Sequence, residues 1–138
     1  MLGSKTADLR ASLVGGLIGM LALACAPAHA QAGAVCRPGG SVAETNACAV
    51  QAFQAADATI AVLYGDVMRA LAAHERPQLR QEHSAWQRAR TLRCKQATRA
   101  TEQQPDGPRT YHECLTHETQ ERRKGLMRWL SADSPAKP

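Results

Sequence analysis

The sequence predicts an all-α domain: a three-helix antiparallel hairpin-plus-helix arrangement stapled by two disulfides. Apolar residues recur at three- and four-residue steps in three segments, and breaks containing proline or glycine separate these segments. Four cysteines remain once a removable leader is subtracted, an even number that suits an oxidising compartment. No segment shows the two-residue alternation of a half-buried strand.

Residues 1–30 read as a secretory signal peptide. Lys5 and Arg10 give a positive start, and residues 11–25 form an uncharged apolar stretch that is short for a membrane span. Small residues stand at the −3 and −1 positions of a cleavage site in Ala28-His29-Ala30. We therefore expect a periplasmic or secreted protein, cleaved after Ala30 and without a stable membrane span.

Cys25 offers a second way of processing the leader. The run Leu21-Ala22-Leu23-Ala24-Cys25 resembles a bacterial lipobox, which would place a lipid anchor on Cys25. Ala22 stands where that pattern prefers leucine, and the downstream cleavage site is the better one. A soluble product is favoured, and the lipid anchor remains the alternative.

The rest of the chain has the length of one domain, predicted over residues 31–131, with a flexible tail over residues 132–138. The formal net charge of the whole chain is +5. No block of lysine and arginine with interleaved aromatic residues is present, so we expect no nucleic-acid partner.

The first helix is predicted to begin at Ser41-x-x-Glu44, a capping box, and to continue to His74. At 1.5 Å per residue it would be about 50 Å long. Its inward stripe consists of Phe53, Ala56, Ile60, Leu63, Tyr64, Val67 and Leu71.

A second helix is predicted after Arg76-Pro77, because proline suits the first turn of a helix but disfavours helical geometry in the residue before it. It should last to about Ala100, before a loop over residues 102–108. Its inward side is predicted to contain Leu79, Trp86, Ala89, Arg90 and Arg93.

The third helix is predicted to open at a second capping box, Thr110-x-x-Glu113. The helix is predicted to run through Leu115, Thr119, Arg122, Leu126, Trp129 and Leu130. We assign Trp86 to the core and leave the position of Trp129 open.

Helix register favours two of the possible cysteine pairs, Cys94–Cys114 and Cys36–Cys48. Cys94 and Cys114 flank the predicted loop at similar levels of antiparallel helices. A bond between Cys48 and Cys94 would have to span a mismatch of roughly 12 Å along the helices. The other pairings stay open, because the predicted boundaries decide the register.

The titratable residues show no catalytic or metal-binding pattern. The spacing of His74, His83, His112 and His117 fits no zinc motif, so we expect solvated or edge histidines. No G-x-S-x-G motif is present, and a reactive thiol would leave an unpaired partner among the four cysteines. We predict no enzyme activity, no metal and no cofactor. A hydrolase is the weakest of the alternative functions.

Asp57 lies on the inward stripe of the first predicted helix, where an unpaired carboxylate would be costly. Arg90 and Arg122 approach the core boundary from the other two helices. We expect a charge-assisted hydrogen bond between Asp57 and one of these arginines. Its expected role is to fix the register of the helices.

Residues from all three segments give the chain a resemblance to the lysozyme inhibitor LprI-like N-terminal domain family. The matching residues are Cys48, Asp57, Ile60 and Tyr64, then Leu79, Arg80, Ala85, Trp86, Arg90 and Cys94, and finally Cys114, Thr119, Arg122 and Leu126. The chain departs from the family pattern at Ala61, His83, Ala89 and Thr91, where Asn, Gln, an aromatic residue and Asp are usual.

The resemblance implies a secreted, non-enzymatic binding protein whose partner is a lysozyme or another glycan-cleaving envelope enzyme. A basic chain would repel a basic animal-type lysozyme, so inhibition would need a local acidic patch. Glu113, Glu118 and Glu121 lie within two helical turns and are the candidates. The alternative is a structural or accessory envelope protein without an enzyme target.

Overall fold

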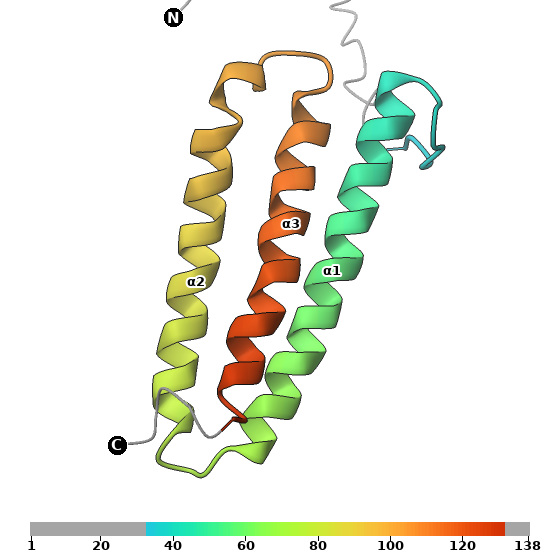
Figure 1. Ribbon diagram of the computed structural model, residues 1–138. Helices are drawn as coiled ribbons and strands as arrows, with labels where there is room; N and C mark the ends of the chain where they lie inside the picture. Colours follow the sequence, from blue (N-terminus) through green and yellow to red (C-terminus); the bar gives the residue numbers. More distant parts are fainter. Residues whose placement is uncertain (1–32, 132–138) are drawn as a thin grey trace, which may run out of the picture.

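The computed structural model describes residues 33–131, which form three α-helices and a short 3-10 helix (Figure 1). The elements are α1 (Val42–Ala70), α2 (Arg76–Ala97), η1 (Arg99–Thr101) and α3 (Gly107–Arg128). The predicted all-α architecture is confirmed. The predicted signal peptide, Cys25 and the tail over residues 132–138 lie outside the described residues.

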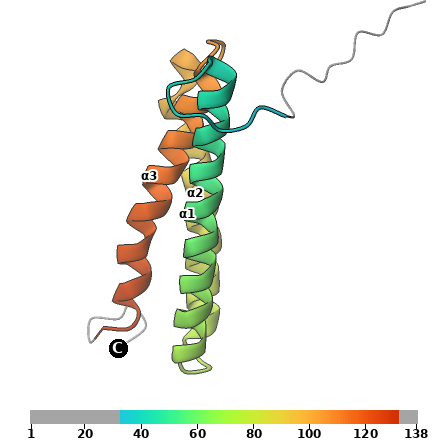
Figure 2. The ribbon, with the colours of Figure 1, turned by 90° about the vertical axis from the view of Figure 1, so that its right-hand side faces the viewer.

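The third helix joins the other two. Figure 1 shows α3 running between α2 and α1, and Figure 2 shows it displaced to one side of the α1–α2 hairpin. α1 and α3 pack along most of their length, whereas α1 and α2 make few contacts with each other. The fold therefore depends on the contacts that α3 makes with α1 and with α2.

α1 begins where the sequence predicts, but it ends earlier than predicted. The Ser41 side chain accepts a hydrogen bond from the Glu44 backbone at 3.3 Å, and the Glu44 carboxylate accepts one from the Ser41 backbone at 2.8 Å. The helix ends at Ala70 and not at His74, because Leu71 turns extended and buries its side chain. The Glu75 carboxylate then closes the turn by accepting from the Ala72 backbone at 2.9 Å.

α2 begins at Arg76 with Pro77 in its first turn, as predicted. The helix stops at Ala97, three residues short of the predicted end, and η1 follows. The Thr98 hydroxyl donates to the Cys94 carbonyl at 2.8 Å and helps to end the helix. Arg93, predicted to face inward, is exposed.

The predicted capping box at the start of α3 is wrong. The helix begins at Gly107, with a proline in its first turn, and the Thr110 hydroxyl donates to the Asp106 carbonyl at 3.2 Å. A Cβ atom on Gly107 would lie 2.4 Å from the Thr101 carbonyl oxygen. Glycine therefore lets the incoming loop approach η1, and this distant contact sets the start of the helix.

The hydrophobic core lies where α1 turns into α2 and α3 ends, and we call this part of the bundle the apolar end. Its members are Ile60, Val67, Leu71, Leu79, Leu126 and Trp129. Trp129, whose position the sequence left open, is 2 % exposed, whereas Leu130 is 46 % exposed and not part of the core.

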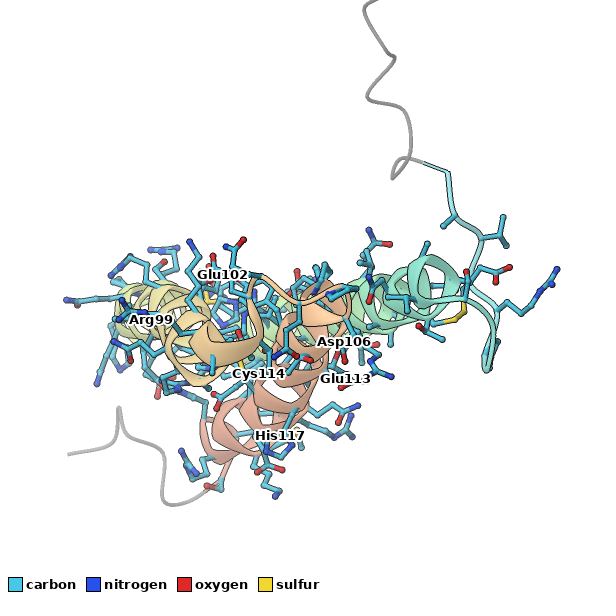
Figure 3. All side chains as sticks on the ribbon, turned by 90° about the horizontal axis from the view of Figure 1, so that it is seen from above. Arg99, Glu102, Asp106, Glu113, Cys114 and His117 are labelled. Atoms are coloured by element: carbon cyan, nitrogen blue, oxygen red, sulfur yellow. A yellow bond between two sulfur atoms is a disulfide. The ribbon has the colours of Figure 1, made fainter. Side chains whose placement is uncertain are left out.

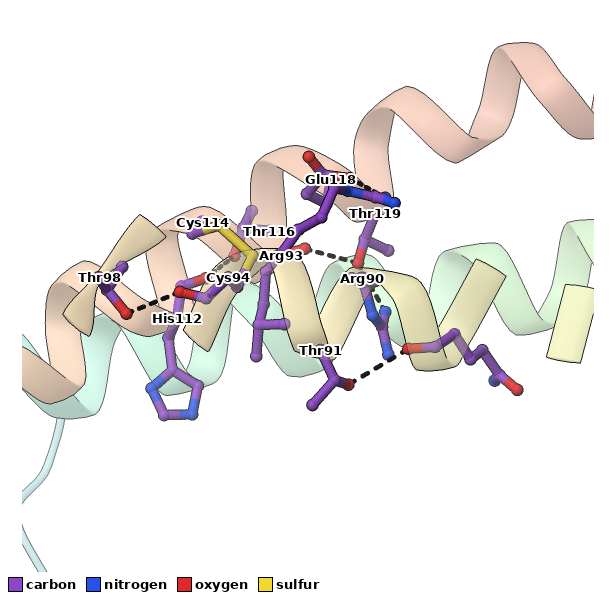
Figure 4. The surroundings of a disulfide bond; sticks show 12 residues. Arg90, Thr91, Arg93, Cys94, Thr98, His112, Cys114, Thr116, Glu118 and Thr119 are labelled. Atoms are coloured by element: carbon purple, nitrogen blue, oxygen red, sulfur yellow. Dashed lines mark hydrogen bonds and ion pairs between the residues drawn. A yellow bond between two sulfur atoms is a disulfide. The ribbon is translucent and has the colours of Figure 1, made fainter. Parts of the chain in front are cut away.

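The opposite end of the bundle, which we call the disulfide end, holds both predicted disulfides. Cys36 is bonded to Cys48 and Cys94 to Cys114, so both predicted pairings are confirmed. Figure 4 shows the second bond between α2 and α3, close to the Thr98–Cys94 hydrogen bond. The first bond ties the segment before α1 to the first turns of that helix.

α1 has the length and the apolar composition of a membrane-crossing helix, with a mean hydropathy of 1.2 over its most apolar part. The core helix of a soluble protein can have the same properties, but only 11 % of this part of α1 is buried in the bundle. The absence of a stable membrane span stays a prediction.

Candidate functional site

Charged and aromatic side chains cross the middle of the bundle, between the apolar end and the disulfide end. We call this set the charged layer: Asp57, Tyr64, Glu82, His83, Trp86, Arg90, Thr119 and Arg122. All three helices contribute to it. Except for Glu82 and His83, its members are the motif residues on which the family resemblance rests.

Arg90 is the centre of the charged layer. Its Nη1 donates to Asp57 Oδ1 at 2.6 Å and to Thr119 Oγ1 at 2.7 Å, which links α2 to both neighbouring helices. The guanidinium also lies over the rings of Phe53 and Trp86, at 5.1 and 4.7 Å from their centroids. The Asp57 side chain is 45 % exposed, so the ion pair is only half enclosed.

Arg122 pairs with Glu82, a residue for which the sequence predicted no role. Its Nη1 donates to Glu82 Oε1 at 2.7 Å, and the other oxygen of Glu82 accepts from Trp129 Nε1, also at 2.7 Å. Glu82 thereby connects the charged layer to the apolar end. The signal was present in the sequence, because Glu82, Trp86 and Arg90 follow one another at four-residue steps on the same side of α2.

His83 is buried, against the expectation of solvated or edge histidines. Its ring stacks on Tyr64 of α1 at 4.2 Å between centroids and lies 5.2 Å from the ring of Trp86. Burial lowers the pKa of His83 below its usual value, and the positive charges of Arg122 and Arg90 lower it further. Glu82 and Asp57 act in the opposite direction but are weaker influences on this pKa.

Trp86, assigned to the core from the sequence, is only half-buried. It packs against the edge of the core and lies between the guanidinium groups of Arg90 and Arg122, the latter 5.4 Å from its ring. A planar guanidinium stacks on an aromatic ring better than a lysine ammonium does, so lysine would be a poor substitute at both positions.

The charged layer is suited to holding the helices in register. Each carboxylate accepts from an arginine, and Thr119 donates to the Leu115 carbonyl at 2.6 Å while it accepts from Arg90. Within residues 33–131, no group of three or more metal-ligating side chains lies close enough to hold an ion.

The three glutamates proposed to contact a partner all lie on α3, but each has a basic neighbour. Glu118 pairs with Arg93, and Glu121 Oε2 is 2.8 Å from Lys124 Nζ. Glu113 is the most exposed of the three, and its nearest basic atom, Arg109 Nε, is 4.0 Å away. Glu113 therefore retains the most accessible negative charge.

Two further acidic side chains, Glu102 and Asp106, lie at the disulfide end, where Arg99 is also found (Figure 3). Figure 3 looks down on this end and labels Glu102 and Asp106 in the loop between η1 and α3. The loop is well anchored, because Asn46 Nδ2 of α1 donates to the Pro105 carbonyl at 2.9 Å. An open groove of about 310 Å³ runs beside the loop and is lined by Glu102, Gly107, Tyr111 and His112.

Comparison with known families gives one result. The model of a family described as "Lysozyme inhibitor LprI" matches residues 36–126, which is more than half of the chain and includes all four paired cysteines. No curated protein and no solved structure shows significant similarity to the chain.

Proposed function

Because the chain belongs to the lysozyme inhibitor LprI family, we propose that it is an exported, non-enzymatic protein that binds and inhibits a lysozyme or a related glycan-cleaving enzyme. The observation that carries this proposal is the extent of the family match. It runs from Cys36 to Leu126 and so includes both disulfides, the charged layer and nearly all of the three helices.

We place the enzyme-contacting surface at the disulfide end. Glu102 and Glu113 are exposed there, and Asp106, which pairs with Arg109 at 2.9 Å, lies between them in the chain. An animal-type lysozyme is basic, so a local acidic surface would favour its approach although the chain as a whole is basic. Glu118 and Glu121 contribute less to this proposal than the sequence suggested, since Arg93 and Lys124 neutralise them.

Rigidity also supports the disulfide end as the contact surface. Hydrogen bonds from Thr101, Gln104 and Gly107 backbones to residues three positions earlier fold the loop tightly. The Cys94–Cys114 bond and the Asn46–Pro105 hydrogen bond hold it against two helices. A loop ordered before binding loses little conformational entropy on association, which raises affinity.

The charge distribution supports a second candidate function, a structural or accessory envelope protein without an enzyme target. α2 contains six basic residues and one acidic residue, Glu82, which is partly exposed and bound to Arg122. A surface of this kind repels a basic enzyme unless the enzyme meets the disulfide end alone.

The two candidates differ in an inhibition assay with the oxidised protein. We expect the purified chain, beginning at Gln31, to reduce the rate at which at least one animal-type lysozyme clears a suspension of bacterial cell walls. Inhibition should saturate with inhibitor concentration. The variant Glu102→Gln/Glu113→Gln should inhibit about tenfold more weakly, since it removes two exposed charges from the proposed contact.

A matched control is Asp66→Asn/Glu121→Gln, which removes the same charge from pairs with Arg69 and Lys124 outside the disulfide end. It should inhibit as well as the parent protein. Equal weakening by both variants would move the contact away from the disulfide end. Absence of inhibition with every lysozyme tested, and of binding in a pull-down with wall-lytic enzymes, would favour the accessory role.

A further inference from the structure

The outer face of α2 carries basic side chains that have no ion-pair partner among residues 33–131. Arg80, Arg88 and Lys95 belong to α2, and Arg99 continues the row in η1. All four are exposed. We call this row the basic face, and Figure 3 shows nitrogen-tipped side chains spreading from this side of the bundle, where Arg99 is labelled.

The basic face lies beside the packed side of α2. At 100° per residue, Arg80, Arg88 and Lys95 fall within about a quarter of the helix circumference. The buried residues Leu79, His83, Arg90 and Cys94 occupy a neighbouring sector, whose centre is about 110° away around the helix. From Arg80 to Lys95 the row extends for roughly 22 Å along α2, and Arg99 follows in η1.

Several other basic residues of the described chain are paired, although Arg123 and Arg128 of α3 also have no ion-pair partner within residues 33–131. Arg69 pairs with Asp66, Arg109 with Asp106, and Lys124 with Glu121. On α2 the single acidic residue, Glu82, is partly exposed and bound to Arg122. The positive charge of the basic face is therefore compensated by no carboxylate in the described part of the chain.

The other residues on this face indicate the kind of partner. Leu92 is its large apolar residue, 57 % exposed, and the aromatic residue of α2, Trp86, lies between Arg90 and Arg122 on another side. Binding in a membrane interface normally uses several apolar or aromatic anchors. Binding to single-stranded nucleic acid normally uses aromatic side chains on which bases stack.

We propose that the basic face binds a linear acidic polysaccharide, with carboxylate or sulfate groups of successive sugars pairing with Arg80, Arg88, Lys95 and Arg99. A straight row of cations fits an extended chain that carries repeated negative charges. Affinity comes from ion pairs and from the release of counterions that the polymer had condensed, so it falls steeply with salt. The basic face reaches the disulfide end, because Lys95 lines the same groove as Glu102, but polysaccharide binding does not require inhibition of an enzyme.

The probe for this proposal is sodium alginate, a linear polymer of uronic acids, with uncharged dextran as the reference polymer. Binding to the oxidised protein is measured by titration calorimetry from low to moderate salt. We expect saturable binding to alginate at low salt and none to dextran. The variant Arg88→Gln/Lys95→Gln should bind at least about tenfold more weakly, with a logarithmic salt dependence shallower by about 1 to 2.

Two variants separate the basic face from net charge and from folding. Arg69→Gln/Lys124→Gln removes the same charge elsewhere and should bind alginate as the parent protein does. Arg80→Lys/Arg88→Lys keeps the charge and should retain binding. Circular dichroism of each variant should show an unchanged melting temperature, since all the substituted residues are exposed.

Three results would overturn the proposal. The first is a parent protein that does not bind alginate at low salt. The second is equal loss of binding in Arg69→Gln/Lys124→Gln, which would make net charge the cause. The third is tighter binding to anionic phosphatidylglycerol vesicles or to a single-stranded oligonucleotide than to alginate, which would identify a membrane surface or a nucleic acid as the partner.

Discussion

The two ends of the bundle are stabilised by different means. At the apolar end Val67, Leu79 and Leu126 are completely buried, and burial of such side chains contributes roughly 1.5–3 kcal/mol each. At the disulfide end the buried residues include Ala49, Thr98 and Leu115, and a disulfide bond links α2 to α3. A domain of this size has one modest core, and the disulfides stabilise the part that the core does not reach.

The two ends are also expected to have different roles: the apolar end contributes to stability and the disulfide end to recognition. The apolar end buries Val67, Leu79 and Leu126, whereas the disulfide end exposes a rigid loop with Glu102 and Gln103. Substitutions at the apolar end should therefore lower stability first and affect binding only through unfolding. The charged layer between the ends should behave in an intermediate way, because Arg90 is buried but Asp57 is half-exposed.

The largest effect is expected from Trp129→Ala at the apolar end. The ring is 2 % exposed, and its loss leaves a cavity that should lower the free energy of unfolding by about 3–5 kcal/mol. Trp129→Phe should cost less, about 1–2 kcal/mol, since Glu82 loses a hydrogen bond but keeps Arg122. Urea denaturation measures both. A loss below 1 kcal/mol for Trp129→Ala would mean that the end of α3 is not part of the core.

The next effect is expected at the disulfide end, from Cys94→Ala/Cys114→Ala. The bond closes a loop of 20 residues, and its removal should lower the free energy of unfolding by about 3 kcal/mol. Cys36→Ala/Cys48→Ala should cost less, because the segment before α1 is exposed and gains freedom in the folded state too. Denaturation of the two variants under oxidising conditions compares them. Equal losses would show that the N-terminal segment packs more firmly than its exposure suggests.

A smaller effect is expected in the charged layer. Arg90→Met should lower the free energy of unfolding by about 2 kcal/mol, less than for a fully enclosed pair, because Asp57 can be solvated once the arginine is gone. Arg93→Met is the matched control on the same helix. Its pair with Glu118 is at the surface and should contribute less than about 1 kcal/mol. If urea denaturation shows similar losses in the free energy of unfolding for both variants, the ion pair of the charged layer stabilises the protein no more than a surface ion pair does.

Local signals in the sequence predicted much of this structure. Ser41 and Pro77 mark helix starts through interactions with residues one turn away, and these starts are where the sequence placed them. The pairing of Asp57 with an arginine followed from its place on an inward stripe. Such predictions succeed because the partners are either close in the chain or required by burial.

The predictions from the sequence were wrong where contacts between residues distant in the chain determine the structure. α3 starts at Gly107 and not at Thr110, because the loop approaches η1 closely. His83 is buried by Tyr64, a residue of another helix that no spacing along α2 reveals. Trp86 is half-exposed because two arginine side chains cover its ring in place of apolar residues. The start of α3 and the positions of His83 and Trp86 are therefore set by contacts that exist only in the folded bundle.

The smallest effect, and the sharpest probe of the charged layer, is the pH dependence that His83 confers. Burial, Arg122 and Arg90 lower the pKa of His83 in the folded protein, whereas in the unfolded chain the pKa is near its ordinary value of about 6.5. The unfolded chain therefore binds a proton first as the pH falls. The stability contributed by neutral His83 is complete above pH about 6.5 and decreases below it, until the pH reaches the lowered pKa.

His83→Gln removes this titration and places at position 83 the amide that is usual in the resembled family pattern. The difference in free energy of unfolding between the parent protein and His83→Gln should shift against the parent when the pH is lowered from about 7.5 to about 5. Contributions from His74, His112 and His117 cancel in this difference, because both proteins contain them. Urea denaturation at the two pH values provides the measurement. A difference that is independent of pH would mean that the charged layer accepts the protonated ring, with Glu82 and Asp57 compensating for the arginines.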